Sequence, residues 1–583
     1  MKKQQAPQHR RRRLRLAVGT PLALTAAGVI AYGAVFGIFG DDSRPQASAA
    51  PAPVPGNAMA AVAAMQPGWN LGNSLDAIPD ETSWGQPRTT KALLDSVRAQ
   101  GFKSIRIPVT WSDHEGAGPN YTIDPAYLSR VRQVVDWAIA DGFYVIINVH
   151  HDSWQWTSKM STDHDQVLAR FNTTWTQIAT AFRNEPSQLL FESVNEPKFD
   201  NADTSRSAQL LNELNTSFHK VVRASGGGNT KRLLMLPTEV CTPDQRLMDN
   251  LATTIKSLHD SRLIATVHYY GYFPFSVNVA GATRFDAQAQ ADLNKTFKRM
   301  HDTFVAKGIP VVLGEYGLLS YDSGPGAVER GEMLKYFEAL GHAARSNKVT
   351  TELWDNGAFY DRGKRRWKDA GLFRQIRSSW TTRSATASSD DVFVPKSGAV
   401  KDRTLTLNLN GTTFKALKQG TTKLVGGRDY TLSGNRLTLK APALTRLVGN
   451  RSYGVRATLQ AEFSQGVPWR IRVISQDAPV QSSTTGTTGS FSIPTQFRGD
   501  LLATMEAQYA DGGSAGQTNW SPYQQFNTAF APDYAKNIIR LTPAFLDAVK
   551  DNAPVKLTFH FWSGATMTYH VAKSGSTVSG TAS

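Results

Sequence analysis

The chain has 583 residues and a formal net charge of +16 at pH 7, with 40% hydrophobic and 19% charged residues. This length exceeds what one hydrophobic core usually organises, and the composition excludes a wholly disordered chain, so we expect several folded domains. A single cysteine, Cys241, excludes an intramolecular disulfide, a cysteine-based zinc site and an iron–sulfur cluster.

The positive charge is unevenly distributed along the chain. Residues 1–49 hold eight Lys or Arg against two Asp, and residues 383–583 hold 21 against 12 Asp or Glu, whereas the middle is nearly neutral. No basic, aromatic-interleaved recognition motif accompanies this charge, so we expect no nucleic-acid partner.

The first 49 residues have the layout of an export signal. Basic residues precede an apolar stretch from Leu16 to Gly40, and the small-residue run Ala47-Ser48-Ala49 follows it. The apolar stretch is about as long as a bilayer is thick, so an uncleaved membrane anchor is the alternative. We predict that residues 1–49 are a signal peptide or N-terminal anchor of a secreted protein, which contacts a membrane only if this segment is not cleaved. Residues 50–66 are predicted to be an Ala/Pro linker.

Between residues 67 and 382, short apolar runs alternate with stretches of helical length. Eight such runs occur, and they are rich in Val, Ile and Leu, as in SIRIPVTW, YVIINVHHD and PVVLGEYG. Buried strands separated by helices indicate a parallel sheet, and eight repeats favour an α/β fold of the (β/α)8 TIM barrel type. No phosphate-binding glycine-rich turn follows the first run, which argues against a nucleotide-binding fold.

The composition changes near residue 381. A polar linker leads into short alternating runs with Asn-Gly, Gly-Gly and Gly-Asn turns, which are typical of antiparallel hairpins. We predict two small all-β sandwich domains, over residues 390–466 and 467–575, and place the run Trp469–Gln476 at the start of the second.

Polar residues end nearly every predicted barrel strand, which is where the active sites of such barrels lie. These residues are Arg106, His150, His151, Asn195, Glu196, Glu239, His268, Tyr270, Glu315 and Trp354. Glu196 ends the fourth run and Glu315 the seventh, so we expect the two carboxylates to face one another across the barrel mouth. Paired carboxylates are what glycoside hydrolysis requires, since one protonates the leaving oxygen while the other attacks the anomeric carbon.

This interpretation gives each candidate a role. Glu196 serves as the acid/base, while Arg106 and Tyr270 are candidates to keep Glu315 ionised. Asn195 is suited to hold the sugar 2-hydroxyl, and Trp354 offers an apolar face for the ring. A single Glu at a strand end is often only a surface charge, but two of them in polar clusters favour catalysis.

A metal site and a cysteine nucleophile are the other chemistries to consider. His150, His151 and Asp152 lack a third His or Cys at ligand spacing, so we expect no metal, and no cofactor is needed. We interpret Cys241 as a buried small hydrophobe.

Seven of the motifs together resemble glycoside hydrolase family 5. They are GWNLGNSLDA, SIRIPVTW, IINVHHD, ESVNEP, HYY, LGEYG and ELWDNG, and the first resembles the subfamily 4 endoglucanases and xyloglucanases. By this resemblance, Glu196 is the acid/base and Glu315 the nucleophile of a retaining mechanism. The family's substrate-contacting and supporting positions fall on Arg106, His150, Asn195, His268, Tyr270 and Trp354.

The C-terminal units also resemble known modules. Residues 390–466 resemble a bacterial immunoglobulin-like module, and residues 467–575 resemble the family 46 carbohydrate-binding module. Trp520 lies in a polar loop, so we predict that it is exposed and binds polysaccharide, whereas Trp469 and Trp562 lie on strands and are assigned to the core.

We therefore predict a secreted, monomeric, retaining endo-β-1,4-glucanase that hydrolyses cellulose-like, mixed-linkage or xyloglucan chains. A mannanase or another retaining β-glycanase on the same barrel is the alternative among enzymes. A non-catalytic wall-polysaccharide-binding protein is the alternative from another class. The preferred glucan stays open at this point, as does the question of whether the last module binds sugar alone or completes the catalytic cleft.

Overall fold

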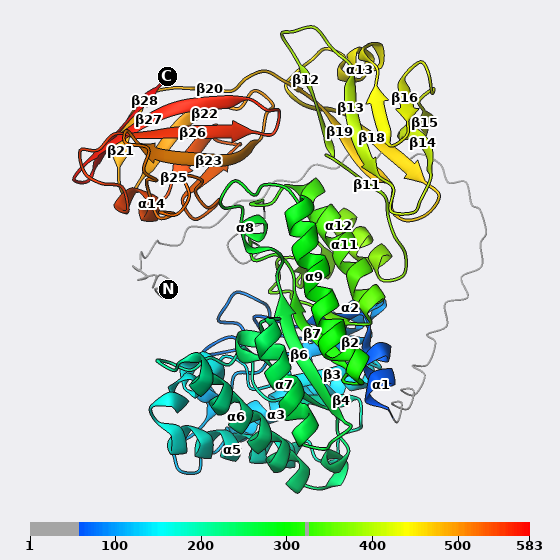
Figure 1. The fold of residues 1–583 in the computed structure, drawn as a ribbon, viewed down its shortest axis with the longest axis vertical. Coiled ribbons are helices and arrows are strands. Elements are labelled where there is room, and N and C mark those ends of the chain that lie inside the picture. The colour runs from blue at the N-terminus through cyan, green and yellow to red at the C-terminus, as the bar shows by residue number, and fades with distance from the viewer. Residues whose placement is uncertain (1–56, 321–325) are drawn as a thin grey trace, which may run out of the picture. The chain divides into compact units, whose positions relative to one another are not determined.

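The computed structural model describes residues 57–320 and 326–583 (Figure 1). The predicted signal peptide or anchor, residues 1–49, lies outside the described residues, as does the first part of the predicted linker, residues 50–56. Within the described ranges, no helix is long and apolar enough to cross a membrane.

Eight parallel strands close into a barrel in the order β1 to β8. They are β1 (Gly68–Asn70), β2 (Ser104–Ile107), β3 (Tyr144–Asn148), β4 (Leu189–Glu192), β5 (Leu234–Pro237), β6 (Leu263–Tyr269), β7 (Val311–Tyr316) and β8 (Thr350–Leu353). Nearly every strand residue is buried, because the barrel interior covers one face of each strand and the helices cover the other. The predicted (β/α)8 fold is confirmed.

Helices connect the strands around the barrel (Figure 1). The longer ones are α2 (Lys91–Ala99), α3 (Pro125–Ala140), α5 (His164–Ala181), α6 (Thr204–Ala224), α7 (Gln245–Ser257), α9 (Ala287–Thr303), α11 (Arg330–Asn347) and α12 (Ala370–Ser379). Side chains at Thr90, Asp124, Asp203, Asp244 and Asp286 cap the first turns of five of these helices.

Short elements follow several strands at their carboxyl ends. They are η1 (Ser112–His114), α4 (Asp152–Gln155), η2 (Thr157–Ser161), η4 (Glu239–Cys241) and α8 (Phe273–Ser276), while η3 (Gly227–Thr230), η5 (Val305–Lys307) and the hairpin of β9 (Tyr360–Asp361) and β10 (Arg366–Trp367) lie elsewhere in the domain. These short turns leave the barrel mouth lined by side chains rather than covered by long helices.

A helix occupies part of the interval that we expected to be a linker. Residues 58–65 form α1 (Ala58–Met65), and the Asn57 side chain caps it by accepting a hydrogen bond from Met59 N at 2.8 Å. Val62 and Met65 are buried in one cluster with residues of β3 to β7. The linker prediction is therefore wrong for residues 58–66. The alanine-rich segment looked featureless, but alanine has the highest helix propensity, and the buried Val and Met give the helix a packing face.

The first C-terminal sandwich consists of two sheets. One has the strand order β11 (Thr386–Ala387), β13 (Arg403–Asn408), β17 (Arg436–Leu439) and β16 (Tyr430–Ser433), and the other has β12 (Asp391–Pro395), β19 (Trp469–Gln476), β18 (Gly454–Phe463), β14 (Phe414–Gln419) and β15 (Thr422–Lys423). Helix α13 (Ala441–Val448) packs against β18 and β19. We had placed the β19 segment in the last domain, but it pairs with β12 and β18, so the first sandwich extends to Gln476. A five-residue connection from β18 makes this hairpin pairing the local one.

The last sandwich also has two sheets. One has the order β20 (Val480–Gln481), β22 (Phe491–Gln496), β25 (Ile538–Leu541) and β24 (Phe530–Asp533), and the other has β21 (Thr484–Thr487), β28 (Thr577–Ala582), β27 (Thr566–Ser574), β26 (Val555–Phe561) and β23 (Leu502–Tyr509). Helix α14 (Pro543–Asp547) adds Phe545 and Leu546 to their core. The final strand extends the domain beyond residue 575.

The packing of α1 leads to a test with a matched pair of methionines. Met65→Ala removes a fully buried side chain and should lower the free energy of unfolding of the barrel by about 2–5 kcal/mol, whereas Met59→Ala, at a half-buried position, should cost clearly less. The midpoint of thermal unfolding measures both effects. Equal midpoints for the two variants and the wild type would mean that the segment behaves as a loose linker after all.

Candidate active site

A buried arginine lies at the centre of the barrel mouth. Arg106, on β2, donates to both Glu192 oxygens, from Nε at 2.7 Å and from Nη2 at 3.1 Å. Its Nη1 donates to Glu315 Oε1 at 2.7 Å and to Asn70 Oδ1 at 3.0 Å, and its Nη2 donates to Asn195 Oδ1 at 2.8 Å. This one side chain therefore connects β1, β2, the carboxyl end of β4 and β7.

The charge of this arginine is balanced by two carboxylates. Burial alone would lower the pKa of Arg106, but the charges of Glu192 and Glu315 outweigh it and raise the pKa above its ordinary value. A buried charge is stable only when it is paired and fully hydrogen-bonded, and Arg106 meets both conditions.

The two predicted catalytic glutamates face one another. Carboxylate oxygens of Glu196 and Glu315 and a ring nitrogen of His268 all lie within 4.8 Å of one another. His268 Nδ1 lies 2.9 Å from Glu196 Oε1 and 3.6 Å from Glu315 Oε2, and the Tyr270 hydroxyl donates to Glu315 Oε2 at 2.5 Å. Glycoside hydrolases place two carboxyl groups on either side of the bond that they cleave, and this pair lies close enough to do so.

The environments of the two glutamates differ. The Glu315 side chain is 6% exposed and receives hydrogen bonds on both oxygens, whereas the Glu196 side chain is 39% exposed. Hydrogen bonds to both oxygens thus hold Glu315 in one orientation at the cavity wall, while Glu196 is more open to water and to a ligand. The backbone of Glu196 has a φ of 41°, a conformation that few non-glycine residues adopt, and that therefore costs free energy.

His268 lies between the two glutamates with acidic groups around it. Burial disfavours its imidazolium form, but its neighbours Cys241, Glu315 and Glu196 outweigh this and hold the pKa of His268 well above its ordinary value. Cys241 itself is fully buried, and burial raises the pKa of its thiol, which fits the predicted structural role better than that of a nucleophile.

His150 and Trp354 form one wall of the cleft. Their rings are parallel within 5°, with centroids 6.0 Å apart, and Asn148 Nδ2 lies 3.0 Å from His150 Nδ1. Burial, helped by the nearby cations, lowers the pKa of His150 well below its ordinary value. This imidazole is therefore neutral at physiological pH and acts as a hydrogen-bonding group rather than as a charge.

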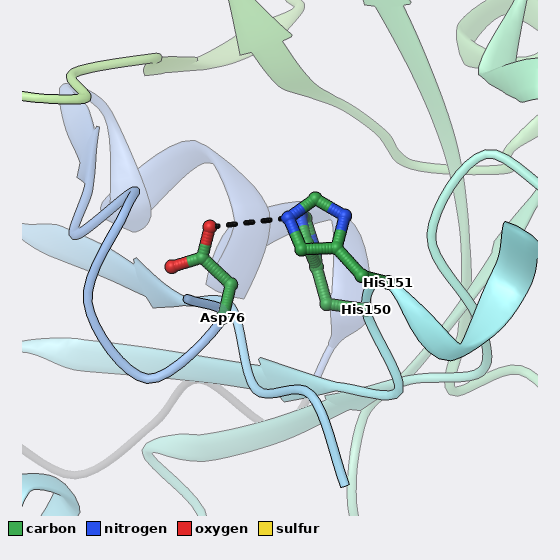
Figure 2. A group of neighbouring side chains, drawn as sticks. All are labelled: Asp76, His150 and His151. Carbon is green, nitrogen blue, oxygen red and sulfur yellow. Dashed lines mark ion pairs between the residues drawn. The ribbon is translucent and has the colours of Figure 1, made fainter. Parts of the chain in front are cut away.

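Figure 2 shows Asp76 beside the two consecutive histidines, with an ion pair between Asp76 Oδ2 and His151 Nε2 at 3.4 Å. Proximity alone would permit a metal ion here. However, each Asp76 oxygen already accepts a backbone N–H, from Ser74 or Asn73, and Trp154 Nε1 donates to His151 Nδ1. These hydrogen bonds fix the orientation of the Asp76 carboxylate and of the His151 ring.

A cavity of about 380 Å³ unites these groups. It is lined by aromatic rings and hydrogen-bonding side chains, namely Asn73, Trp84, His150, His151, Asn195, Glu196, Tyr270, Glu315, Leu319, Trp354 and Asn356. All predicted barrel residues line it or lie directly beneath it, except Glu239, which is half-buried in η4. Aromatic faces beside polar groups are what a pyranose ring requires of its binding site.

Two buried carboxylates were missed by the sequence analysis. Glu192 shares Arg106 with Glu315, and Glu352, on β8, accepts a hydrogen bond from Ser104 Oγ at 2.6 Å. A Cβ atom on Gly68 would lie 1.9 Å from Glu352 Oε2, so glycine is required opposite this carboxyl. The sequence did contain a signal, since each glutamate is a charged residue inside an apolar run, Glu192 in FES and Glu352 in TEL. Such a pattern predicts a strand but does not by itself indicate a role in the site.

The tryptophans of the two C-terminal domains have different surroundings. Trp520 is 64% exposed, as predicted for a sugar-contacting ring. Trp469 is buried in the core of the first sandwich, and Trp562 is half-buried with the Arg284 guanidinium 4.8 Å from its ring centroid.

Comparisons with known proteins agree along the whole described chain. Residues 71–359 match the cellulases of glycosyl hydrolase family 5, residues 386–473 match carbohydrate binding domain X2, and residues 477–581 match the CBM46 carbohydrate binding domain. Endoglucanase B of Paenibacillus lautus is 53% identical over 545 residues, which cover 93% of this chain and 96% of the relative.

Solved structures show the same three-part organisation. The tri-modular endo-β-1,4-glucanase B of Bacillus halodurans is 45% identical with a TM-score of 0.89, over 90% of this chain and 99% of that one. A tri-modular subfamily 4 endo-β-1,4-glucanase from Bacillus licheniformis is 31% identical with a TM-score of 0.77, over 88% and 99%.

A TIM barrel with facing carboxylates after β4 and β7 has the arrangement that glycoside hydrolysis requires, and the comparisons show that the chain is a glycoside hydrolase. The chain belongs to glycosyl hydrolase family 5 and is an endoglucanase of that family, with two carbohydrate-binding domains after the catalytic barrel. The predicted family and enzyme class are confirmed.

The buried Glu352 makes stability depend on pH. Burial raises the pKa of Glu352 to about 8, so the folded protein retains a proton that the unfolded chain loses above about pH 4. Stability should therefore fall between about pH 5 and pH 8, and Glu352→Gln should remove this contribution. The variant should gain thermal stability relative to the wild type as the pH rises from 5 to 8, as measured by melting midpoints. A difference that stays constant over this range would contradict the assignment.

Proposed function

We propose that this endoglucanase acts by a retaining mechanism in which Glu315 is the nucleophile and Glu196 the acid/base. The observation that carries the proposal is the pair of carboxylates within 4.8 Å of one another at the ends of β4 and β7. The unequal surroundings of the pair support the assignment of roles, since Glu315 is buried against Arg106 and Glu196 is open to water.

The first step forms a glycosyl-enzyme. Glu196 donates its proton to the glycosidic oxygen as the bond between that oxygen and the anomeric carbon breaks, and a Glu315 oxygen forms a bond to the same carbon. In the second step, Glu196 takes a proton from a water molecule, and the water oxygen displaces Glu315. In this step Glu315 is released from the sugar as a carboxylate, and hydrogen bonds from Arg106 and Tyr270 stabilise its negative charge.

The neighbouring side chains position the sugar. Asn195 accepts from Arg106 through Oδ1, which leaves its Nδ2 hydrogens for the sugar 2-hydroxyl. Trp354 offers its ring to the apolar face of the pyranose, and His150 supports that ring in parallel. His268 orients Glu196 for proton transfer.

The substrate is a β-1,4-linked glucan, such as cellulose-like chains, mixed-linkage glucan or xyloglucan. Solved relatives support this range, since the Bacillus licheniformis enzyme was crystallised with cellotetraose and a metagenomic relative is described as specific for xyloglucan. Trp520, exposed on the last module, contributes a stacking surface for the polysaccharide. The carbohydrate-binding domains support the proposal that the protein is secreted, since enzymes with such domains act on polymeric substrates.

The central prediction concerns the two glutamates. In residues 50–583, Glu315→Gln and Glu196→Gln should each lower kcat on a β-glucan by about 10³-fold or more, because each removes one half of the acid–nucleophile pair. Release of reducing sugar from xyloglucan, mixed-linkage β-glucan, carboxymethylcellulose and mannan measures the effect. The matched control is Glu239→Gln, a glutamate at the end of β5 outside the cavity, which should retain normal activity.

The same panel separates the alternatives. Hydrolysis of mannan with none of the glucans would select a mannanase, and binding of polysaccharide without hydrolysis would select a binding protein. Normal turnover by either catalytic variant, in a folded protein, would overturn the assignment of the site.

A further inference from the structure

The loop that follows Tyr270 is held by the last module. Asn278 lies in this loop, after α8, and its Nδ2 donates to Ala503 O on β23 at 2.9 Å and to Ala327 O at 2.8 Å. Its own carbonyl accepts from Phe526 N, also in the last module, at 3.1 Å. Three hydrogen bonds made by one residue thus join the barrel loop to three other segments, two of which belong to the last module.

These hydrogen bonds are protected from water. Asn278 is 2% exposed and has a φ of 52°, a left-handed conformation that asparagine adopts more readily than most residues. Ala327, which precedes α11, is itself buried in the hydrophobic core of the last module. Buried hydrogen bonds of this kind cannot be exchanged for bonds to solvent without breaking the contact, so the loop is fixed in one position.

Two aromatic side chains of the last module lie beside the loop at further positions. The Tyr523 ring lies so close to Gly281 that a Cβ atom there would be 3.3 Å from it, and the Arg284 guanidinium lies over the Trp562 ring. The loop therefore contacts the last module at three positions, Asn278, Gly281 and Arg284.

The same loop holds a residue of the active site. Ser276, at the end of α8, donates from Oγ to Tyr270 O at 2.5 Å and accepts from Leu319 N at 2.8 Å. The Tyr270 hydroxyl in turn donates to Glu315 Oε2. Only the short helix α8 separates Tyr270, which contacts Glu315, from Asn278, which is bonded to the last module.

We propose that Asn278 is a positioning residue through which the last module holds Tyr270 against Glu315. The C-terminal carbohydrate-binding domain then contributes to the chemical step itself, in addition to any contact with polysaccharide. This inference rests on the proposed function of Glu315 as the nucleophile. If the inference is correct, removal of the Asn278 hydrogen bonds slows the hydrolysis even of substrates that are too short to reach the last module.

The test uses the full chain and a chromogenic cellobioside. Asn278→Asp keeps the size of the side chain and its tolerance of positive φ, but a carboxylate cannot donate to the two carbonyls. Its kcat should fall about tenfold with KM unchanged within about twofold, because Tyr270 is misplaced rather than the sugar site. Asn278→Gly keeps the backbone conformation without adding charge and should show the same loss. The matched control is Asn537→Asp, the same change at an exposed, positive-φ position of the last module, which should behave as the wild type.

A double-mutant cycle with Tyr270→Phe distinguishes positioning from general destabilisation. If Asn278 acts through the Tyr270 hydroxyl, Asn278→Asp should cost little further kcat in the Tyr270→Phe background, whatever its effect on thermal stability. Full additivity of the two losses, or normal kcat for both Asn278 variants, would overturn the inference. Normal Asn278 variants beside an inactive Glu315→Gln would leave the proposed function standing, whereas an active Glu315→Gln would overturn the proposed function instead.

Discussion

The buried guanidinium of Arg106 is the interaction on which the rest of the active site depends. It neutralises Glu192 and Glu315 and orients Asn195, so four strands of the barrel converge on one charge. Loss of one partner of a buried ion pair typically costs about 3–5 kcal/mol, because the other charge is left without compensation. This penalty fixes Glu315, the proposed nucleophile, in place before substrate arrives, and a preorganised site of this kind has little reorganisation to complete during catalysis.

The barrel was predictable because its signal is local and repeated. Eight apolar runs with polar endings follow directly from strands that are buried on both faces, and the turn residues after residue 390 marked hairpins. The two errors, α1 and β19, share a cause. Whether an alanine-rich segment is a helix or a linker, and which sheet receives a hairpin strand, depends on packing partners far away in the sequence, such as the strand residues that bury Met65.

The residues of the candidate site also divide into those with a local sequence signal and those that depend on distant contacts. Residues at strand ends could be identified from their place in the pattern, and the structure brings Glu196, Glu315, His268 and Tyr270 together. Glu192 and Glu352 could not be identified, because within a strand the sequence does not show which side chains meet inside the barrel. The proposed role of Asn278 depends on a contact with the last module, more than 200 residues away in the sequence. No local sequence pattern predicts such a contact.

The most direct test of the account is to trap the covalent intermediate. The fluorine of a 2-fluoro cellobioside slows both steps of a retaining enzyme, whereas a good leaving group speeds only the first step, so the glycosyl-enzyme accumulates. Proteolysis and mass spectrometry should find the sugar on the peptide that contains Glu315, and no adduct should form in Glu315→Gln. A label on another residue, or a first product of inverted anomeric configuration, would contradict the account.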